Sequence, residues 1–214
     1  RVLYIQALIT ILTQLKPKEM LQTKINLTNN QLIIPSFISS ITSSLSPSSL
    51  SLLFQRLYKK ISQYLTFLSS LWSTLFSLLQ EVTPTIVSHT QQLIAPLLKH
   101  TIGLFQYIEE IVIQLQIFHT ANSTTATATA TINSPTTANE PSNNSPLALD
   151  STWLSRTEWL SLIDEYFTKL IPKGLSISNR NVYLCTLLFL SQALSAVPNI
   201  VFPYTSVLLP QLIN

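Results

Sequence analysis

The chain has 214 residues, enough for one or two domains with a core, and only 10 % of them are charged, against about 25 % in a typical soluble domain. Glycine occurs twice, which excludes the glycine-rich loops that bind phosphates and disfavours an all-β fold built on tight hairpins. The formal net charge is +3 and is unevenly spread: residues 1–60 hold seven Lys or Arg and one acid (+6), and the remainder holds five against eight (−3). So few charges argue against nucleic acid as a partner.

The first predicted helix spans residues 1–16 and ends before Pro17. Its apolar residues share one face: Ile5, Leu8, Leu12 and Leu15. No small-residue cleavage site follows, so we expect no secretory signal, and we expect the chain, which opens on Arg1, to be a piece of a longer protein. A weaker helical segment up to Leu27 and a short helix over residues 35–45 are predicted next.

A long helix is predicted from about residue 48 to residue 82, with Ser46 as its N-cap and Pro47 in its first turn. Its apolar residues recur at alternating spacings of four and three, which indicates packing against other helices: Leu50, Phe54, Leu57, Ile61, Tyr64, Leu68, Leu71, Leu75, Leu78 and Val82. A neighbouring column of the helix is mainly apolar too, and it includes Tyr58, Leu65, Trp72 and Leu79. This broad face predicts a helix packed between two neighbours.

The opposite face of the long helix distinguishes water from membrane. Between Gln55 and Gln80, eleven of its twelve positions are polar, and Phe76 is the exception. A lipid-facing helix is apolar on most of its circumference, so this stripe favours a water-facing amphipathic helix over a membrane span. A polar stripe turned toward the inside of a membrane bundle is the alternative.

The next helix is predicted to begin at Thr83 and Pro84, which repeat the pairing of a cap with a proline. We expect Pro96 to kink or split this helix, because proline lacks the N–H that an interior turn needs. Beyond Pro96 a helical face continues to Phe118.

A polar stretch, residues 120–148, interrupts the helical pattern. Its only large apolar side chains are Ile132 and Leu147. Because so little apolar surface cannot offset the entropy of ordering, we predict a disordered low-complexity linker. It divides the chain into an N-terminal helical block, residues 1–119, and a C-terminal helical block, residues 149–214.

The C-terminal block is predicted to hold three helices. Ser155 and Glu158 form a capping box before the first, because the hydroxyl and the carboxylate can each satisfy a free backbone amide. This helix is expected to end at "IPKG" and to bury Trp159, Ile163, Tyr166 or Phe167, and Leu170. The second helix is predicted over residues 180–197 and the third from about residue 202.

Residues 181–214 contain no charged side chain, and "VYLCTLLFLSQALSAV" is apolar nearly all round. Such a helix is either buried in protein or lies in a membrane. Its uninterrupted part, residues 182–197, is shorter than the ~20 residues that a span needs, so burial is favoured. Cys185 is expected to be a small core residue; as the single cysteine it excludes an internal disulfide and a cysteine-based zinc site, and it favours a reducing compartment.

This C-terminal segment, residues 180–214, resembles a HEAT-type helical repeat, with a helix, a Pro-Asn turn and a second helix containing "VLLPQLI". Residues 83–118 are similar in outline. The Asp and Val-Arg positions often seen in HEAT repeats are absent, so another α-solenoid or an irregular bundle stays open. The resemblance implies stacked helix pairs, in a class whose members are mostly scaffolds, adaptors and transport receptors.

Three basic residues are the candidate partner-binding site. Arg56, Lys59 and Lys60 share one face of the long helix through i, i+3 and i+4 spacing. A compact cationic face of this kind is suited to an acidic protein partner.

The remaining polar residues do not form a catalytic pattern. His89 and His100 are eleven residues apart, too far to share a metal ion, and both are expected to be solvated. Two adjacent acidic pairs point in different directions on a helix, so neither is a paired-carboxylate site and both are expected to face solvent: Asp164 with Glu165, and Glu109 with Glu110.

The sequence therefore predicts an all-α segment, either a helical-repeat solenoid or an irregular bundle, with a long disordered insertion. The leading hypothesis is a non-enzymatic protein-interaction scaffold or adaptor within a large assembly in the cytoplasm or nucleus. No catalytic residue, cofactor or metal ion is expected. The alternative is a membrane-embedded or membrane-surface helical protein.

Overall fold

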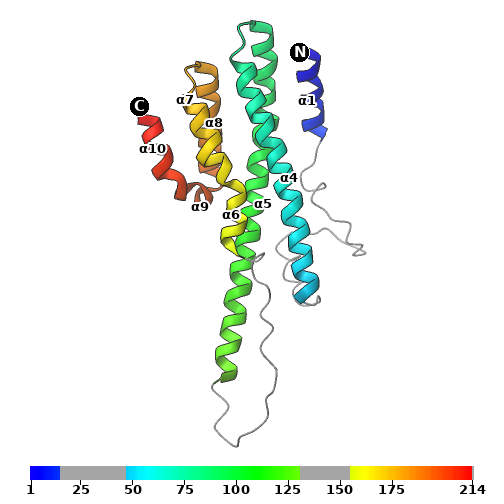
Figure 1. Cartoon of the computed structure of the whole chain (residues 1–214), viewed down its shortest axis with the longest axis vertical. Helices are drawn as coiled ribbons and strands as arrows, with labels where there is room; N and C mark the ends of the chain where they lie inside the picture. The colour runs from blue at the N-terminus through cyan, green and yellow to red at the C-terminus, as the bar shows by residue number, and fades with distance from the viewer. Residues whose placement is uncertain (15–46, 131–154, 214) are drawn as a thin grey trace, which may run out of the picture.

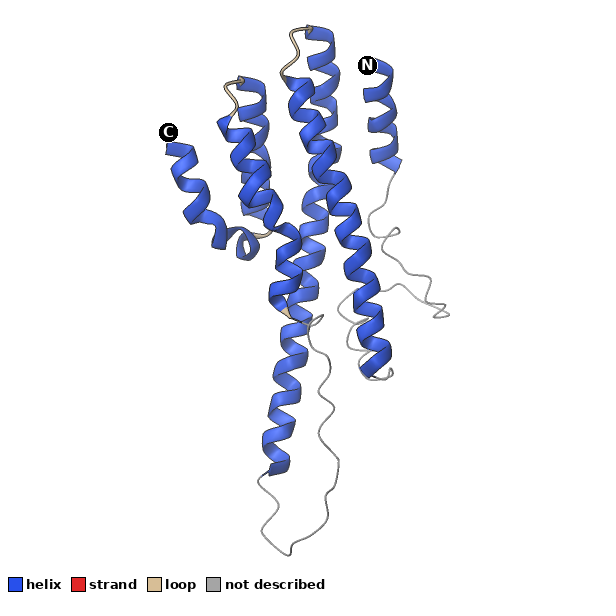
Figure 2. Ribbon diagram, viewed as in Figure 1, coloured by secondary structure: helices blue, strands red, loops and turns tan. Residues whose placement is uncertain are grey.

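The computed structural model describes residues 1–14, 47–130 and 155–213. Every regular element in these ranges is a helix, so the all-α prediction is confirmed (Figure 2). The predicted segment up to Leu27, the predicted helix over residues 35–45 and residues 131–148 of the predicted linker lie outside the described residues.

Antiparallel helices form a row across the molecule (Figure 1). At one side, α4 (Pro47–Leu79) and α5 (Pro84–Ala130) form a long hairpin. α1 (Val2–Gln14) packs on the outer side of this hairpin, against α5.

The C-terminal block forms a second hairpin that packs on the first. Its first arm consists of three consecutive pieces: α6 (Arg156–Glu165), the π-helical turn η2 (Tyr166–Leu170) and α7 (Ile171–Ser176). Its second arm is α8 (Arg180–Ala196). Three short elements complete the row, and the last of them packs on α7: α9 (Pro198–Val201), the 3-10 turn η3 (Phe202–Tyr204) and α10 (Thr205–Ile213).

α4 buries the face that its spacing predicts. Ile61 and Leu68 are fully enclosed, and the flanks of this face contact α5 on one side and the C-terminal block on the other. Two details differ from the prediction. The helix ends at Leu79, so Val82 lies beyond it and is 94 % exposed. Phe76, the exception in the polar stripe, is buried.

α5 begins at Pro84 as predicted, and of the two outcomes expected at Pro96, a kink or a split, the split does not occur, because the helix continues through this residue. Proline removes one interior hydrogen bond. Leu93 and Leu97, on either side of it, are buried and hold this stretch against its neighbours. The helix also continues to Ala130, so the first part of the predicted linker has a helical backbone.

The first helix of the C-terminal block starts as predicted and ends differently. The Ser155 hydroxyl accepts a hydrogen bond from the Glu158 N–H at 3.2 Å. The helix does not end at "IPKG"; a wide π turn precedes Pro172, whose ring would otherwise press on the carbonyl four residues earlier. The extra residue in this turn lets Tyr166 and Phe167, which were expected as alternatives, both be buried.

α8 matches the predicted second helix, and Asn179 caps it. The Asn179 side-chain oxygen accepts hydrogen bonds from the N–H groups of Asn181 and Val182, at 2.9 and 3.2 Å. The helical path then resumes at Pro198 rather than near residue 202, because the fixed φ of proline suits a first helical turn. The chain bends by 116° at this break.

One hydrophobic core joins the two blocks. At its centre, Trp72 of α4 meets Phe189 of α8 edge to face with ring centroids 4.9 Å apart, and Phe105 of α5 meets Tyr166 of η2 at 5.2 Å. The Tyr166 hydroxyl donates a hydrogen bond to the Leu65 carbonyl at 2.6 Å, and burial raises the pKa of this tyrosine. The described parts of both blocks therefore fold around a shared set of aromatic rings.

Gly174 of α7 lies close to α8 within its own hairpin and to α4 of the other. A Cβ at this position would lie 2.3 Å from the Thr186 hydroxyl and 3.1 Å from the Phe76 ring. Gly174→Ala should therefore lower the free energy of unfolding by about 1–3 kcal/mol, the usual cost of overpacking. Gly103→Ala is the matched control: a Cβ there meets nothing within 4 Å, so it should raise stability by up to about 1 kcal/mol. Urea unfolding measures both, and equal effects would contradict the close approach.

The orientation of α4 can be tested with a leucine on its inner face and a serine on its outer face. Leu68 is fully buried, so Leu68→Ala should cost about 2–5 kcal/mol of unfolding free energy. Ser70 is exposed, so Ser70→Ala should change it by less than about 0.5 kcal/mol. The reverse order in thermal unfolding would mean that the serine face is the packed one, as in a membrane bundle.

Candidate functional site

Arg56, Lys59 and Lys60 lie on one exposed face of α4, as their spacing predicts. None of the three forms a hydrogen bond or an ion pair with another residue that the structure describes. They occupy positions of the helix that point away from the core, so their side chains are free of any part in its packing.

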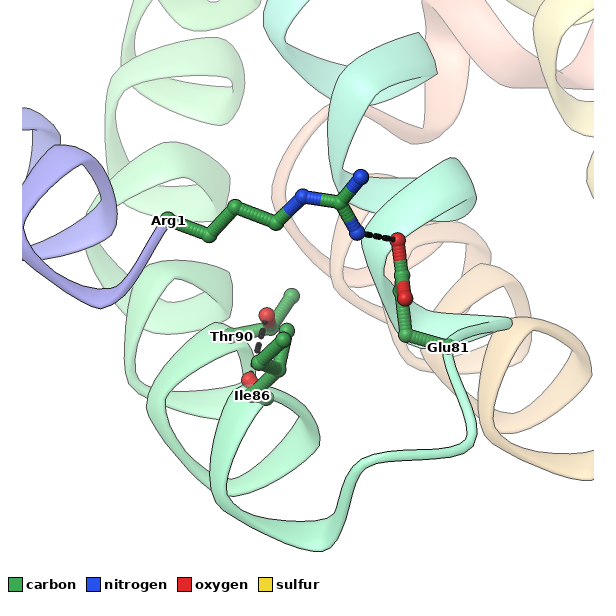
Figure 3. A network of polar contacts seen from close by, with 4 residues as sticks. All are labelled: Arg1, Glu81, Ile86 and Thr90. Atoms are coloured by element: carbon green, nitrogen blue, oxygen red, sulfur yellow. Dashed lines mark hydrogen bonds and ion pairs between the residues drawn. The ribbon is translucent and has the colours of Figure 1, made fainter.

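Few acids lie near this basic cluster in the sequence. Residues 47–108 contain four Lys or Arg and a single acid, Glu81. Glu81 follows the opposite end of α4, and its carboxylate accepts a hydrogen bond from the Arg1 guanidinium in an ion pair (Figure 3). In the hairpin, the acid nearest in sequence is therefore already paired and far along the helix from the cluster.

An exposed aromatic ring lies beside the cluster, and the sequence analysis missed it. Phe67 is 43 % exposed and follows Lys60 by seven residues, two helical turns, so the two share a face of α4. Its ring stacks on that of Tyr64 with centroids 6.4 Å apart and planes 15° apart. The sequence did contain an indication of this site: a phenylalanine at the edge of the apolar face of the helix, seven residues after Lys60.

His100 is buried, so the expectation that it is solvated is wrong. Because a carbonyl can only accept, Nε2 carries the hydrogen and donates it to the Leu12 carbonyl, in the last turn of α1. Nδ1 then accepts from the Tyr64 hydroxyl at 3.2 Å. The ring thus satisfies a carbonyl that the end of α1 would leave unpaired and fixes α1 to the hairpin. His89 is half-buried rather than fully solvated.

The two adjacent acidic pairs take part in helix docking. Asp164 accepts a hydrogen bond from the Tyr204 hydroxyl at 2.7 Å, which ties α6 to η3. Glu109 accepts one from the Asn199 side chain at 3.1 Å, which ties α5 to α9. Asp164 is exposed as expected, whereas Glu109 is half-buried. Both contacts hold the last short helices against the row.

Cys185 is a buried core residue, as predicted. Desolvation raises the pKa of its thiol to about 12, so the sulfur stays protonated at neutral pH. A protonated and enclosed thiol is neither a nucleophile nor a metal ligand.

The described part of the chain offers little to a small ligand. Within it, no three His, Cys, Asp or Glu side chains lie close enough together to hold a metal ion. A small cavity between α1, α4 and α5 has a volume of about 10 Å³, close to the minimum for one water molecule. Apolar side chains and one threonine line it: Leu8, Leu12, Leu71, Thr74, Leu75, Leu78, Leu93 and Leu97.

Among the described residues, no individual helix is both long enough and apolar enough to cross a bilayer. α8 together with the segment Pro198–Ile213 meets the length and composition criteria as a pair, with the 116° bend between them.

Comparisons with protein-family models, with curated proteins and with solved structures found no match for this chain.

The Tyr64–His100 contact yields a prediction about stability. Tyr64→Phe removes the hydroxyl and leaves a buried ring nitrogen without its donor, so it should lower the free energy of unfolding by about 1–3 kcal/mol. Tyr4→Phe is the control, because Tyr4 is 55 % exposed and should change it by less than about 0.5 kcal/mol. Equal unfolding midpoints in urea for the two variants would show that the hydrogen bond has no net effect.

Proposed function

We propose that this chain is a segment of a helical-repeat protein that serves as a non-enzymatic scaffold or adaptor for other proteins. The observation that carries the proposal is the exposed basic cluster of α4, formed by Arg56, Lys59 and Lys60, which forms no ion pair with another described residue. In a chain with 10 % charged residues, three exposed cations within five positions are a concentrated feature. Charges that take no part in the fold are available to select a partner and guide its approach.

The row of helices supports this proposal. Antiparallel pairs pack side by side, as they do in the HEAT-type solenoids that the sequence resembles (Figure 1). At the two ends of the row, α1 and α10 expose apolar side chains, and Leu3 and Ile213 are each 81 % exposed. In a solenoid such faces pack on the adjoining repeats, which fits a place within a large assembly.

The roles of these polar groups and of the cysteine are consistent with a scaffold. His100 holds α1, Asp164 and Glu109 hold the last short helices, and the Cys185 thiol is enclosed and protonated. Each of these groups is engaged in packing or docking, the work expected of a protein whose surface rather than its interior meets partners.

A membrane-embedded or membrane-surface protein is the second candidate, favoured by the bent pair of α8 and Pro198–Ile213. The inner side of α8 argues for the first candidate. Val182, Phe189 and Ala193 are buried in the shared core and are not available to lipid.

The scaffold proposal predicts that partners depend on the basic cluster. Full-length protein carrying Arg56→Glu with Lys60→Glu should recover its co-purifying proteins several-fold less well than wild type, because both reversed charges repel an acidic surface. Lys173→Glu, an exposed cation on α7, is the control and should leave recovery unchanged. Unchanged recovery with the double variant would contradict the proposal, and quantitative retention of the wild type in carbonate-washed membranes would favour the second candidate.

A further inference from the structure

α1 covers only part of the flank of the α4–α5 hairpin on its side. Its Leu8 and Leu12 line the small cavity with Leu71, Thr74 and Leu78 of α4. The last turn of α1 then stops at His100, beside Tyr64. Toward its N-terminal end, α4 continues well past the end of α1 (Figure 1).

Beyond the end of α1, this flank of α4, which no other described element covers, carries one continuous stripe. Arg56, Lys60, Gln63 and Phe67 follow one another at spacings of four, three and four, so they line a single face, and all four are exposed. Lys59 lies directly beside this stripe. The stacking of Phe67 on Tyr64, whose hydroxyl is bonded to His100, holds the exposed ring in place, so little order has to be gained on binding.

On α5, the face that holds His100 continues past the end of α1. Tyr107 lies on this face, two turns beyond His100, and is half-buried like Leu57 of α4. Burial, with the Glu110 carboxylate nearby as the second cause, raises the pKa of Tyr107 to about 12. On this surface of the hairpin, α5 therefore contributes an acid, Glu110, and α4 contributes the cations.

We propose that the stripe of Arg56, Lys60, Gln63 and Phe67, with Lys59 beside it, binds an acidic protein segment that carries a large apolar side chain. Carboxylates of the segment pair with the three cations, and its apolar side chain packs on the exposed Phe67 ring. This inference rests on the proposed scaffold function and specifies the chemistry of the partner.

The charge and composition of the stripe favour an acidic protein segment over two other occupants, residues 15–46 of this chain and single-stranded nucleic acid. The connection from α1 to α4, residues 15–46, holds Lys16, Lys18 and Lys24 against Glu19, so it is repelled by the stripe. Single-stranded nucleic acid is bound by extended basic grooves with several stacking rings, whereas here three cations accompany one exposed ring. A protein segment with a few carboxylates and one apolar anchor matches both the size and the composition of the stripe.

The binding test uses the full chain and a short fluorescein-labelled peptide of glutamate and leucine, followed by fluorescence anisotropy. We expect this peptide to bind, and to bind more weakly as salt rises from about 0.05 to about 0.3 M. A glutamate-only peptide should bind less tightly, and a lysine–leucine peptide should not bind. Tighter binding of a labelled oligouridylate than of the acidic peptide would overturn the proposal in favour of nucleic acid.

Variants locate the site. Arg56→Glu with Lys60→Glu should weaken binding about tenfold, whereas Lys173→Glu on α7 should leave it within about twofold. Phe67→Ser should weaken binding about threefold without altering its salt dependence, because the lost contact is apolar. Glu110→Gln should strengthen binding slightly. Equal losses from the double variant and from Lys173→Glu would overturn the assignment.

Two further outcomes separate this inference from the proposed function. Residues 131–154 contain Glu140 and Asp150 and no cation. If Glu140→Gln with Asp150→Asn raises peptide affinity several-fold, the stripe is covered by this chain itself, and the proposal of a separate partner is overturned. If the peptide fails to bind while the charge-reversed variant still loses its co-purifying proteins, the scaffold function stands and the acidic, apolar partner is wrong.

Discussion

The fold depends on the width of the apolar face of α4. Because this helix buries three columns of side chains rather than two, it can pack on α5 and on the C-terminal block at the same time. The third column supplies Trp72, which meets Phe189 edge to face, and Leu65, whose carbonyl receives the Tyr166 hydroxyl. Together with Phe105 of α5, whose ring meets those of Tyr166, Phe167 and Phe189, this column forms the core that the two hairpins share.

The same width explains which surface remains for a partner. α4 packs on α5 and, on one flank, on the C-terminal block, while Leu8 and Leu12 of α1 lie against its other flank and α1 ends at His100. The basic cluster lies on the part that neither neighbour covers. Among the described residues none forms an ion pair with the cluster, and the acid nearest in sequence within the hairpin, Glu81, pairs with Arg1. Position and charge together, rather than any pocket, make this face the candidate site.

Sequence periodicity predicted the features that depend on neighbours within one helix: the inner face of α4, the start of α5 at Pro84, the Ser155 cap and the extent of α8. It failed where contacts between distant residues determine the result. His100 is buried because α1, 88 positions earlier in the chain, brings a carbonyl to its ring.

Helix continuity at two prolines also depends on contacts with distant residues. Pro96 lies inside α5, where buried leucines on either side hold the helix against its neighbours. At Pro172 a π turn accommodates the proline ring and also buries two adjacent aromatic rings. For the candidate site, spacing predicted the shared face of Arg56, Lys59 and Lys60. It did not predict the exposed Phe67, because exposure on the flank of a helix depends on where the neighbouring helix stops.

Enclosure of the one cysteine has a practical consequence for spectroscopy. Since Cys185 is buried and its thiol is protonated at neutral pH, the native chain presents no competing reactive sulfur to maleimide reagents. A cysteine introduced at an exposed position such as Gln63 would then accept a dye or spin label selectively, without prior removal of the native one. The chain thus provides a clean background for site-specific labelling on the surface of α4.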